Sequence, residues 1–70
     1  MIYRPFVTFP NGTSGFMAVN VCTDQDRQAV LGYVGTIAQR IAGVQPGEVV
    51  SPQRLRELSA RVDFFRVARG

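Results

Sequence analysis

The sequence predicts an α+β domain with the element order β-β-α-α-β, a three-stranded, mostly antiparallel sheet and two helices packed on one face. Three observations carry this prediction. Two segments rich in β-branched and aromatic residues flank an Asn-Gly turn, an amphipathic helical pattern follows, and a Ser-Pro helix start precedes a last apolar strand. With 70 residues, 46% of them hydrophobic, we expect a single compact domain over residues 1–70.

The first two strands are expected over residues 2–9 and 16–22 as a β-hairpin. Asn11-Gly12 lies between them, and this dipeptide favours a tight hairpin turn because both residues tolerate positive φ. Pro5 has no N–H, so its strand is expected to lie at an edge or to be locally irregular there. Alternation predicts that one face of the second strand turns toward the core, namely Met17, Val19 and Val21.

A helix is predicted over about residues 24–42. Thr23 is expected to be its N-cap, with Asp26 at the capping-box position and Gly43 as a C-cap. Spacings of three and four predict one apolar stripe, formed by Val30, Tyr33, Val34, Ile37 and Ile41.

A second helix is predicted to begin at Ser51-Pro52, with the serine as N-cap and the proline in the first turn. Its inner face is expected to comprise Leu55, Leu58 and Val62. Residues 63–68 are predicted as the last strand, and Val49-Val50 as a short extended stretch that would add a minor fourth strand.

The residue inventory excludes several kinds of chemistry. Without histidine there is no Ser-His or Cys-His nucleophile and no histidine metal site, and Cys22 alone cannot form an internal disulfide. We therefore expect no enzyme, no metal and no cofactor. No apolar run reaches the length of about 20 residues that a membrane span needs, and the start lacks signal-peptide features, so we expect no membrane partner and a cytoplasmic location.

The net charge of +3 lies in the C-terminal half, and all basic residues are arginines. Arginine suits bidentate binding of phosphates, so this half is a candidate anion-binding region for a nucleic acid or nucleotide. The candidate residues are Arg54, Arg56, Arg61, Arg66 and Arg69. The alternative is an ordinary solvated surface, since Arg54, Glu57 and Arg61 are spaced to form ion pairs along a helix.

One side of the first predicted helix lacks the charged residues of a solvated surface. Two glycines in the middle of a helix each cost up to about 1 kcal/mol relative to alanine, and small residues allow another backbone to approach closely. The predicted partner or self-association face consists of Gln28, Leu31, Gly32, Gly35, Gln39 and Ala42. The alternatives are a rotated helix or coverage of this side by the second helix.

The segment Tyr3–Phe9 resembles the aromatic strand of RNA-recognition motifs over about six residues. In that family the strand follows a β-α-β beginning, whereas here it opens the chain, so the resemblance does not assign the chain to the family. Aromatic side chains exposed on a sheet could still stack on nucleic-acid bases.

These observations predict a small non-enzymatic protein-binding or regulatory domain of the inhibitor or adaptor type, of a size that bacteriophage accessory proteins also have. Its expected partners are further copies of itself, as a dimer or higher oligomer, and another protein. The alternative function is binding of an anionic ligand, a nucleic acid or nucleotide, through the C-terminal arginines.

Overall fold

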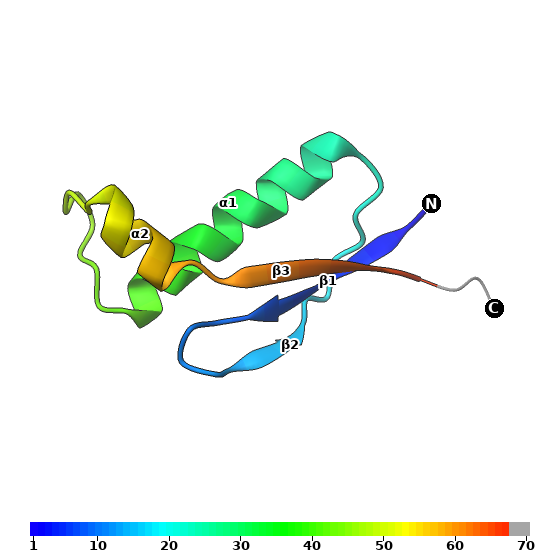
Figure 1. Ribbon diagram of the computed structural model, residues 1–70. Helices are drawn as coiled ribbons and strands as arrows, with labels where there is room; N and C mark the ends of the chain where they lie inside the picture. Colours follow the sequence, from blue (N-terminus) through cyan, green and yellow to red (C-terminus); the bar gives the residue numbers. More distant parts are fainter. Residues whose placement is uncertain (68–70) are drawn as a thin grey trace.

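The computed structural model describes residues 1–67 and has an α+β architecture, with three antiparallel strands in one open sheet and two helices (Figure 1). In chain order the elements are β1 (Tyr3–Thr8), β2 (Ser14–Phe16), α1 (Asp24–Ile41), α2 (Pro52–Leu58) and β3 (Arg61–Arg66). The strand order in the sheet is β2-β1-β3. Neither helix among the described residues is long and apolar enough to cross a membrane.

The predicted hairpin is confirmed, but its turn differs from the one that Asn-Gly suggested. The backbone N–H of Phe9 donates to the Thr13 carbonyl at 2.8 Å, which closes a three-residue loop. Gly12 alone in this loop takes a positive φ, 90°, while the Asn11 side chain accepts from the Thr13 N–H at 2.9 Å. Gly12, the left-handed residue, thus comes after the two central residues of the turn, Pro10 and Asn11. This is the arrangement of three-residue hairpin loops, in which a type I turn is followed by one left-handed residue.

Pro5 lies in the central strand and not at an edge, and its surroundings explain how the sheet tolerates it. The Pro5 carbonyl accepts from the Met17 N–H at 3.0 Å, and beyond that bond the neighbouring chain departs from β1. The missing N–H faces Met17 at the last position before the ladder is interrupted, so the proline removes a bond from the end of the β1–β2 pairing and not from its middle. Of the two predicted alternatives, local irregularity is the one found.

The second strand is shorter than the predicted residues 16–22. β2 ends at Phe16, and the chain returns to β1 only at Val21, which forms an isolated antiparallel bridge with Tyr3. Of the three residues expected to face the core, Val21 is fully buried and Met17 packs against the core, whereas Val19 is half-buried and is not part of the core cluster. β3 likewise begins earlier than predicted, over Arg61–Arg66, because Val62 pairs with Val7.

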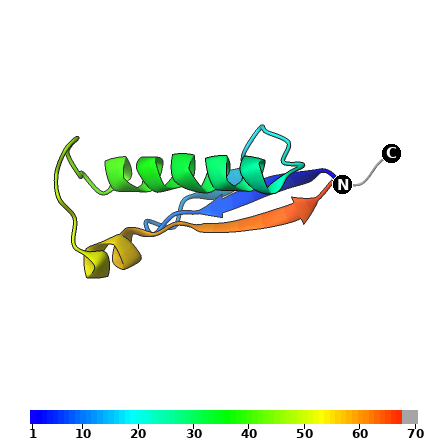
Figure 2. The same cartoon turned by 90° about the horizontal axis from the view of Figure 1, so that it is seen from above.

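The core lies between α1 and one face of the sheet (Figure 2). Its buried residues are Val7, Val21, Val30 and Val34, and Ala38 continues the row along the helix. The predicted stripe is therefore wrong in two places, because Tyr33 is 60% exposed and Ile41 is 47% exposed. The buried row follows i, i+4 spacing, and the strand residue facing α1 on the β2 side is Gly15, which offers Tyr33 no side chain to pack on.

Both ends of α1 are as predicted. Thr23 is the N-cap of a complete capping box with Asp26. At the C-terminus Gly43 has φ +83°, its N–H donates to the Arg40 carbonyl at 3.0 Å, and the Val44 N–H donates to the Gln39 carbonyl at 3.0 Å. This pair of bonds is the Schellman motif, which satisfies carbonyls that the helix leaves open.

The predicted packing of the second helix beside α1, on the same face of the sheet, is wrong. Its start is confirmed, since the Ser51 hydroxyl accepts from the Arg54 N–H at 3.2 Å and the proline occupies the first turn. None of its residues is buried, and it lies at one end of the molecule, away from the core between α1 and the sheet (Figure 2). Its apolar side is too small to hold it against the sheet, because Val62 belongs to β3 and Leu55 is 39% exposed. Val49-Val50 forms no strand, and Val49 is 95% exposed.

Arg27 closes the end of the core where α1 begins. Its guanidinium lies 5.0 Å from the ring centroids of both Tyr3 and Phe64, so it stacks on β1 and β3 at once. Arginine combines a planar cation with an apolar stem, and both parts contribute to such a contact.

We expect Arg27→Ala to lower the free energy of unfolding by about 1–2 kcal/mol, because it removes two cation–π contacts and the packing of the stem. Urea unfolding followed by circular dichroism measures the change. Arg40→Ala, at an exposed position of the same helix, is the matched control and should change the value by less than about 0.5 kcal/mol. Equal effects of the two substitutions would contradict this role for Arg27.

Asp26 makes the N-terminus of α1 sensitive to acid. The backbone N–H groups of Cys22 and Thr23 donate to its carboxylate at 2.9 and 3.1 Å, and these bonds lower the pKa of Asp26 below its usual value. The lowered pKa means that the stabilisation is complete above the unfolded-state pKa of about 4 and is lost as the pH falls through the folded-state pKa.

Asp26→Asn should therefore flatten the decline in stability between pH 5 and pH 2, measured as the urea midpoint at each pH. Asp24→Asn, at an exposed position of the same helical turn, serves as the control. A decline as steep in the Asp26 variant as in the wild type would show that this carboxylate does not contribute.

Candidate functional site

The face of the sheet opposite α1 is not covered by either helix and carries a group of aromatic side chains. Residues of β1 alternate between the two faces, and Val7 points to the core, so Phe6 points away from it. The register extends this outer face over all three strands. We call it the phenylalanine face, and it consists of Arg4, Phe6, Thr8, Ser14, Phe16, Arg61, Asp63 and Phe65.

Three phenylalanines from three different strands contact one another at the centre of this face. The ring of Phe6 lies 4.9 Å from that of Phe16 and 6.2 Å from that of Phe65, and Phe16 and Phe65 are 5.8 Å apart. All three pairs meet edge to face, an arrangement worth about 0.5–1.5 kcal/mol per pair beyond the area buried. Yet Phe16 is 59% exposed and Phe65 is 52% exposed. The three rings thus contact one another, while more than half of the surface of Phe16 and of Phe65 remains accessible to water.

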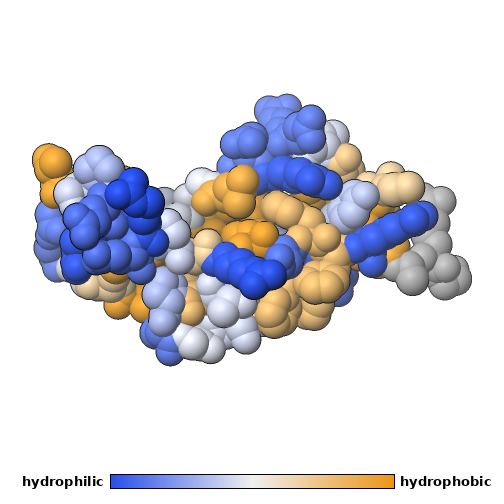
Figure 3. Space-filling model, in the orientation of Figure 1, coloured by the Kyte–Doolittle hydropathy of each residue, from blue (hydrophilic) through white to orange (hydrophobic). Residues whose placement is uncertain are grey.

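Polar side chains surround the three rings. The Arg61 Nε lies 3.1 Å from the Asp63 Oδ2, and both side chains remain accessible. Arg4 is exposed at the other end of the face, beside Phe65. Figure 3 shows hydrophobic surface in the middle of the molecule, with hydrophilic groups around it and a strongly hydrophilic group within it. An aromatic centre within a rim that carries both charge signs is typical of a surface that binds another macromolecule.

The predicted interaction face on the first helix lies on the side and back of α1. Gln28 and Gly32 are exposed, and Leu31 is 43% exposed. The other three residues are half-buried, namely Gly35, Gln39 and Ala42. A Cβ added at Gly32 or Gly35 would meet nothing within 4 Å, so the second helix does not cover this side. The binding role of these six residues stays a prediction.

The structure does not gather the predicted anion-binding arginines into one site. Arg54 and Arg56 belong to α2, at one end of the molecule (Figure 1). Arg61 and Arg66 stand at opposite ends of β3 and, being five residues apart, on opposite faces of the sheet. Arg69 lies outside the described residues. Among the four that the structure describes, Arg61 is the one that belongs to the phenylalanine face.

Sequence reasoning found part of the phenylalanine face. Because Met17 was expected to face the core, its neighbour Phe16 was expected on the opposite side of the strand, and the exposure of Phe16 confirms this. It did not bring Phe6 and Phe65 to the same surface, because their meeting depends on the strand order β2-β1-β3. The adjacent pair Phe64-Phe65 was the available signal, since neighbouring residues of a strand must point to opposite faces.

The described residues form no evident metal centre. Over residues 1–67, no group of three or more Asp, Glu, Cys or His side chains is placed to hold a metal ion. Cys22 is exposed, and its backbone N–H is engaged by Asp26 in the cap of α1. Comparison with known proteins finds no matching family model, no matching curated protein and no matching solved structure.

Proposed function

We propose that this chain is a non-enzymatic protein-binding domain of the regulatory type, an inhibitor or adaptor, which acts as a homo-oligomer and associates through the phenylalanine face. The observation that carries the proposal is the cluster of Phe6, Phe16 and Phe65, whose rings meet edge to face and two of which are exposed. Large aromatic side chains at the centre of a patch contribute most to binding between proteins.

The dimensions of the chain support a missing partner. Its radius of gyration is 13.3 Å, whereas a compact domain of this length has about 11 Å. Its accessible surface is 5252 Å², and a folded monomer of 7.7 kDa exposes about 4,300 Å². The excess of several hundred Å² is comparable to the area of about 800 Å² that each partner loses in a standard interface.

The charges of the phenylalanine face favour a second copy of the same chain as its occupant. The face carries two cations, Arg4 and Arg61, and one anion, Asp63. In a two-fold symmetric dimer a surface meets itself, so both signs must be present for the rims to attract each other. With aromatic rings at the centre and both charges at the rim, this face satisfies that requirement.

Self-association should depend on the rings. We expect sedimentation velocity from about 1 to 100 μM to show the wild type as a dimer or larger, and Phe65→Ser and Phe16→Ser to weaken association by about tenfold or more, since truncating a central aromatic costs about 2 kcal/mol or more. Gly32→Arg, on the outer side of α1, is the matched control and should associate like the wild type.

Two results of this experiment would contradict the assignment. A wild type that remains a 7.7 kDa monomer throughout the series would remove self-association. If Gly32→Arg dissociates the oligomer and the phenylalanine variants do not, the helix face predicted from the sequence is the interface instead. Circular dichroism of each variant confirms that the fold is retained.

A second candidate function is binding of single-stranded nucleic acid on the same face. The observation that favours it is the proximity of exposed rings to Arg4 and Arg61, since bases stack on aromatic side chains and arginines contact phosphates. In this reading a fluorescent oligothymidylate or oligouridylate binds with an affinity that falls steeply with salt and is lost in Phe65→Ser. Salt-tolerant self-association without oligonucleotide binding would favour the protein-binding function.

A further inference from the structure

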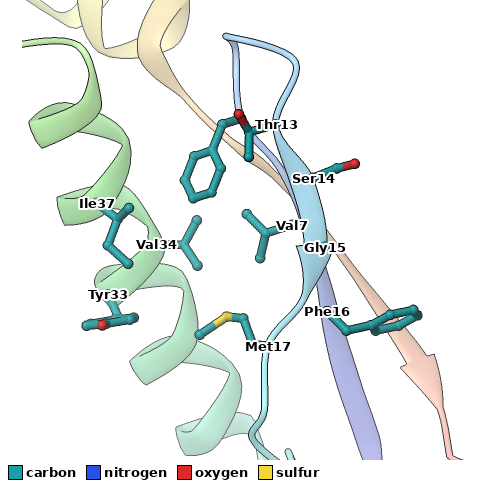
Figure 4. Close-up of a pocket in the computed structure, with 10 residues that line it drawn as sticks. Val7, Thr13, Ser14, Gly15, Phe16, Met17, Tyr33, Val34 and Ile37 are labelled. Carbon is teal, nitrogen blue, oxygen red and sulfur yellow. The ribbon is translucent and has the colours of Figure 1, made fainter.

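An apolar groove runs along the other side of the sheet, between α1 and the hairpin, and shares Ser14 and Phe16 of β2 with the phenylalanine face. It has a volume of about 310 Å³. Val7, Met17, Val34 and Ile37 point into it, while Phe16 points away (Figure 4). A second hollow of about 300 Å³ shares Met17 and Tyr33 with the first and continues past them to Val19 and Ala29. The two hollows are therefore neighbours beside α1.

The groove exists because β2 has no side chain on the helix side. Gly15 is the residue of β2 that pairs with Val7 and therefore faces α1, and a Cβ built there would meet nothing within 4 Å. Above it, Tyr33 extends from the helix without a strand residue to pack on and is 60% exposed. On this side α1 extends beyond the side chains of the sheet, so part of the apolar surface between helix and sheet is accessible to solvent.

The wall of the groove on the strand side is a free hydrogen-bonding edge. The bonds from Phe9 to Thr13 and from Met17 to Pro5 show that odd-numbered residues of β2 bond to β1. By the antiparallel alternation, the N–H and C=O groups of Ser14 and Phe16 point away from β1, toward the outside of the sheet. Such an edge can pair with one more extended chain.

We propose that this groove binds an extended, alternately apolar segment of a partner protein, which adds to the sheet as a fourth strand next to β2. The backbone of the segment would bond to Ser14 and Phe16, and every second side chain would enter the space between Gly15 and Tyr33. A strand fits better than a helix or a compact ligand, because the polar groups along the wall are backbone groups at strand spacing. The remainder of the lining is mainly apolar.

The same geometry favours a different protein over a second copy of this chain. If two β2 strands paired edge to edge with Gly15 opposite Gly15, neither copy would supply a side chain on the helix side at that position, and the groove would stay empty there. A partner segment with a valine, leucine or phenylalanine at that position fills it. The proposal is independent of self-association through the phenylalanine face, which lies on the opposite side of the sheet.

A library of random twelve-residue peptides displayed on phage is the probe, selected on the purified protein. We expect enriched peptides with alternating apolar residues. Synthetic versions should bind Gly15→Leu and Ser14→Pro about tenfold or more weakly than the wild type. The leucine fills the groove, and the proline removes an N–H that β1 does not use. Gly32→Leu is the matched control, since a side chain there meets nothing and lies away from the groove.

Amide hydrogen exchange of the wild type tests the mode of binding without any substitution. The Ser14 and Phe16 amides should exchange fast in the free protein and slowly with a selected peptide bound. The absence of enriched peptides, or equal binding to Gly15→Leu and wild type, would overturn the proposal. The proposal would also be overturned if the Ser14 and Phe16 amides of the free protein became more protected as the protein concentration rises. The occupant of the groove would then be a second copy of this chain. Repeating the binding with Phe65→Ser separates this result from failure of self-association.

Discussion

The structure depends on the packing of one helix against one face of a narrow sheet. Val30 and Val34 of α1 form one cluster with Val7 and Val21, and Ala38 continues the buried row along the helix. This core is small for a chain of 70 residues, and domains of this size have little stability to spare. Each local device that holds α1 in position therefore matters more than it would in a larger domain.

These devices are concentrated at the ends of α1. The capping box of Thr23 and Asp26 sets where the helix begins, and the Schellman motif at Gly43 sets where it stops. Arg27 then stacks on Tyr3 and Phe64, which ties the first turn of the helix to both long strands. Hydrogen bonds, charge and ring stacking thus all act at the start of α1. They hold this end of the helix against β1 and β3 in addition to the contacts of its apolar row.

One helix can cover one face, and this limit explains the two surfaces to which we assign functions. The outer face of the sheet retains three exposed or half-buried phenylalanines because α2 lies at the end of the molecule and does not reach it. The groove remains because β2 is three residues long and has Gly15 where a core side chain would stand. In both places the fold leaves apolar side chains exposed instead of burying them. Exposed apolar patches of this kind mark sites where proteins bind partners.

Short-range chemistry let the sequence alone determine the hairpin, the extent and caps of α1 and the start of α2. Thr23, Asp26, Gly43, Ser51 and Pro52 act on backbone groups within a few residues of themselves. The tertiary structure decided what depends on distant neighbours. It set the strand order that unites Phe6, Phe16 and Phe65, the central place of Pro5, the exposure of Tyr33 and the detachment of α2. Which side of an apolar element is buried depends on the partner that reaches it, and periodicity within one segment carries no information about that partner.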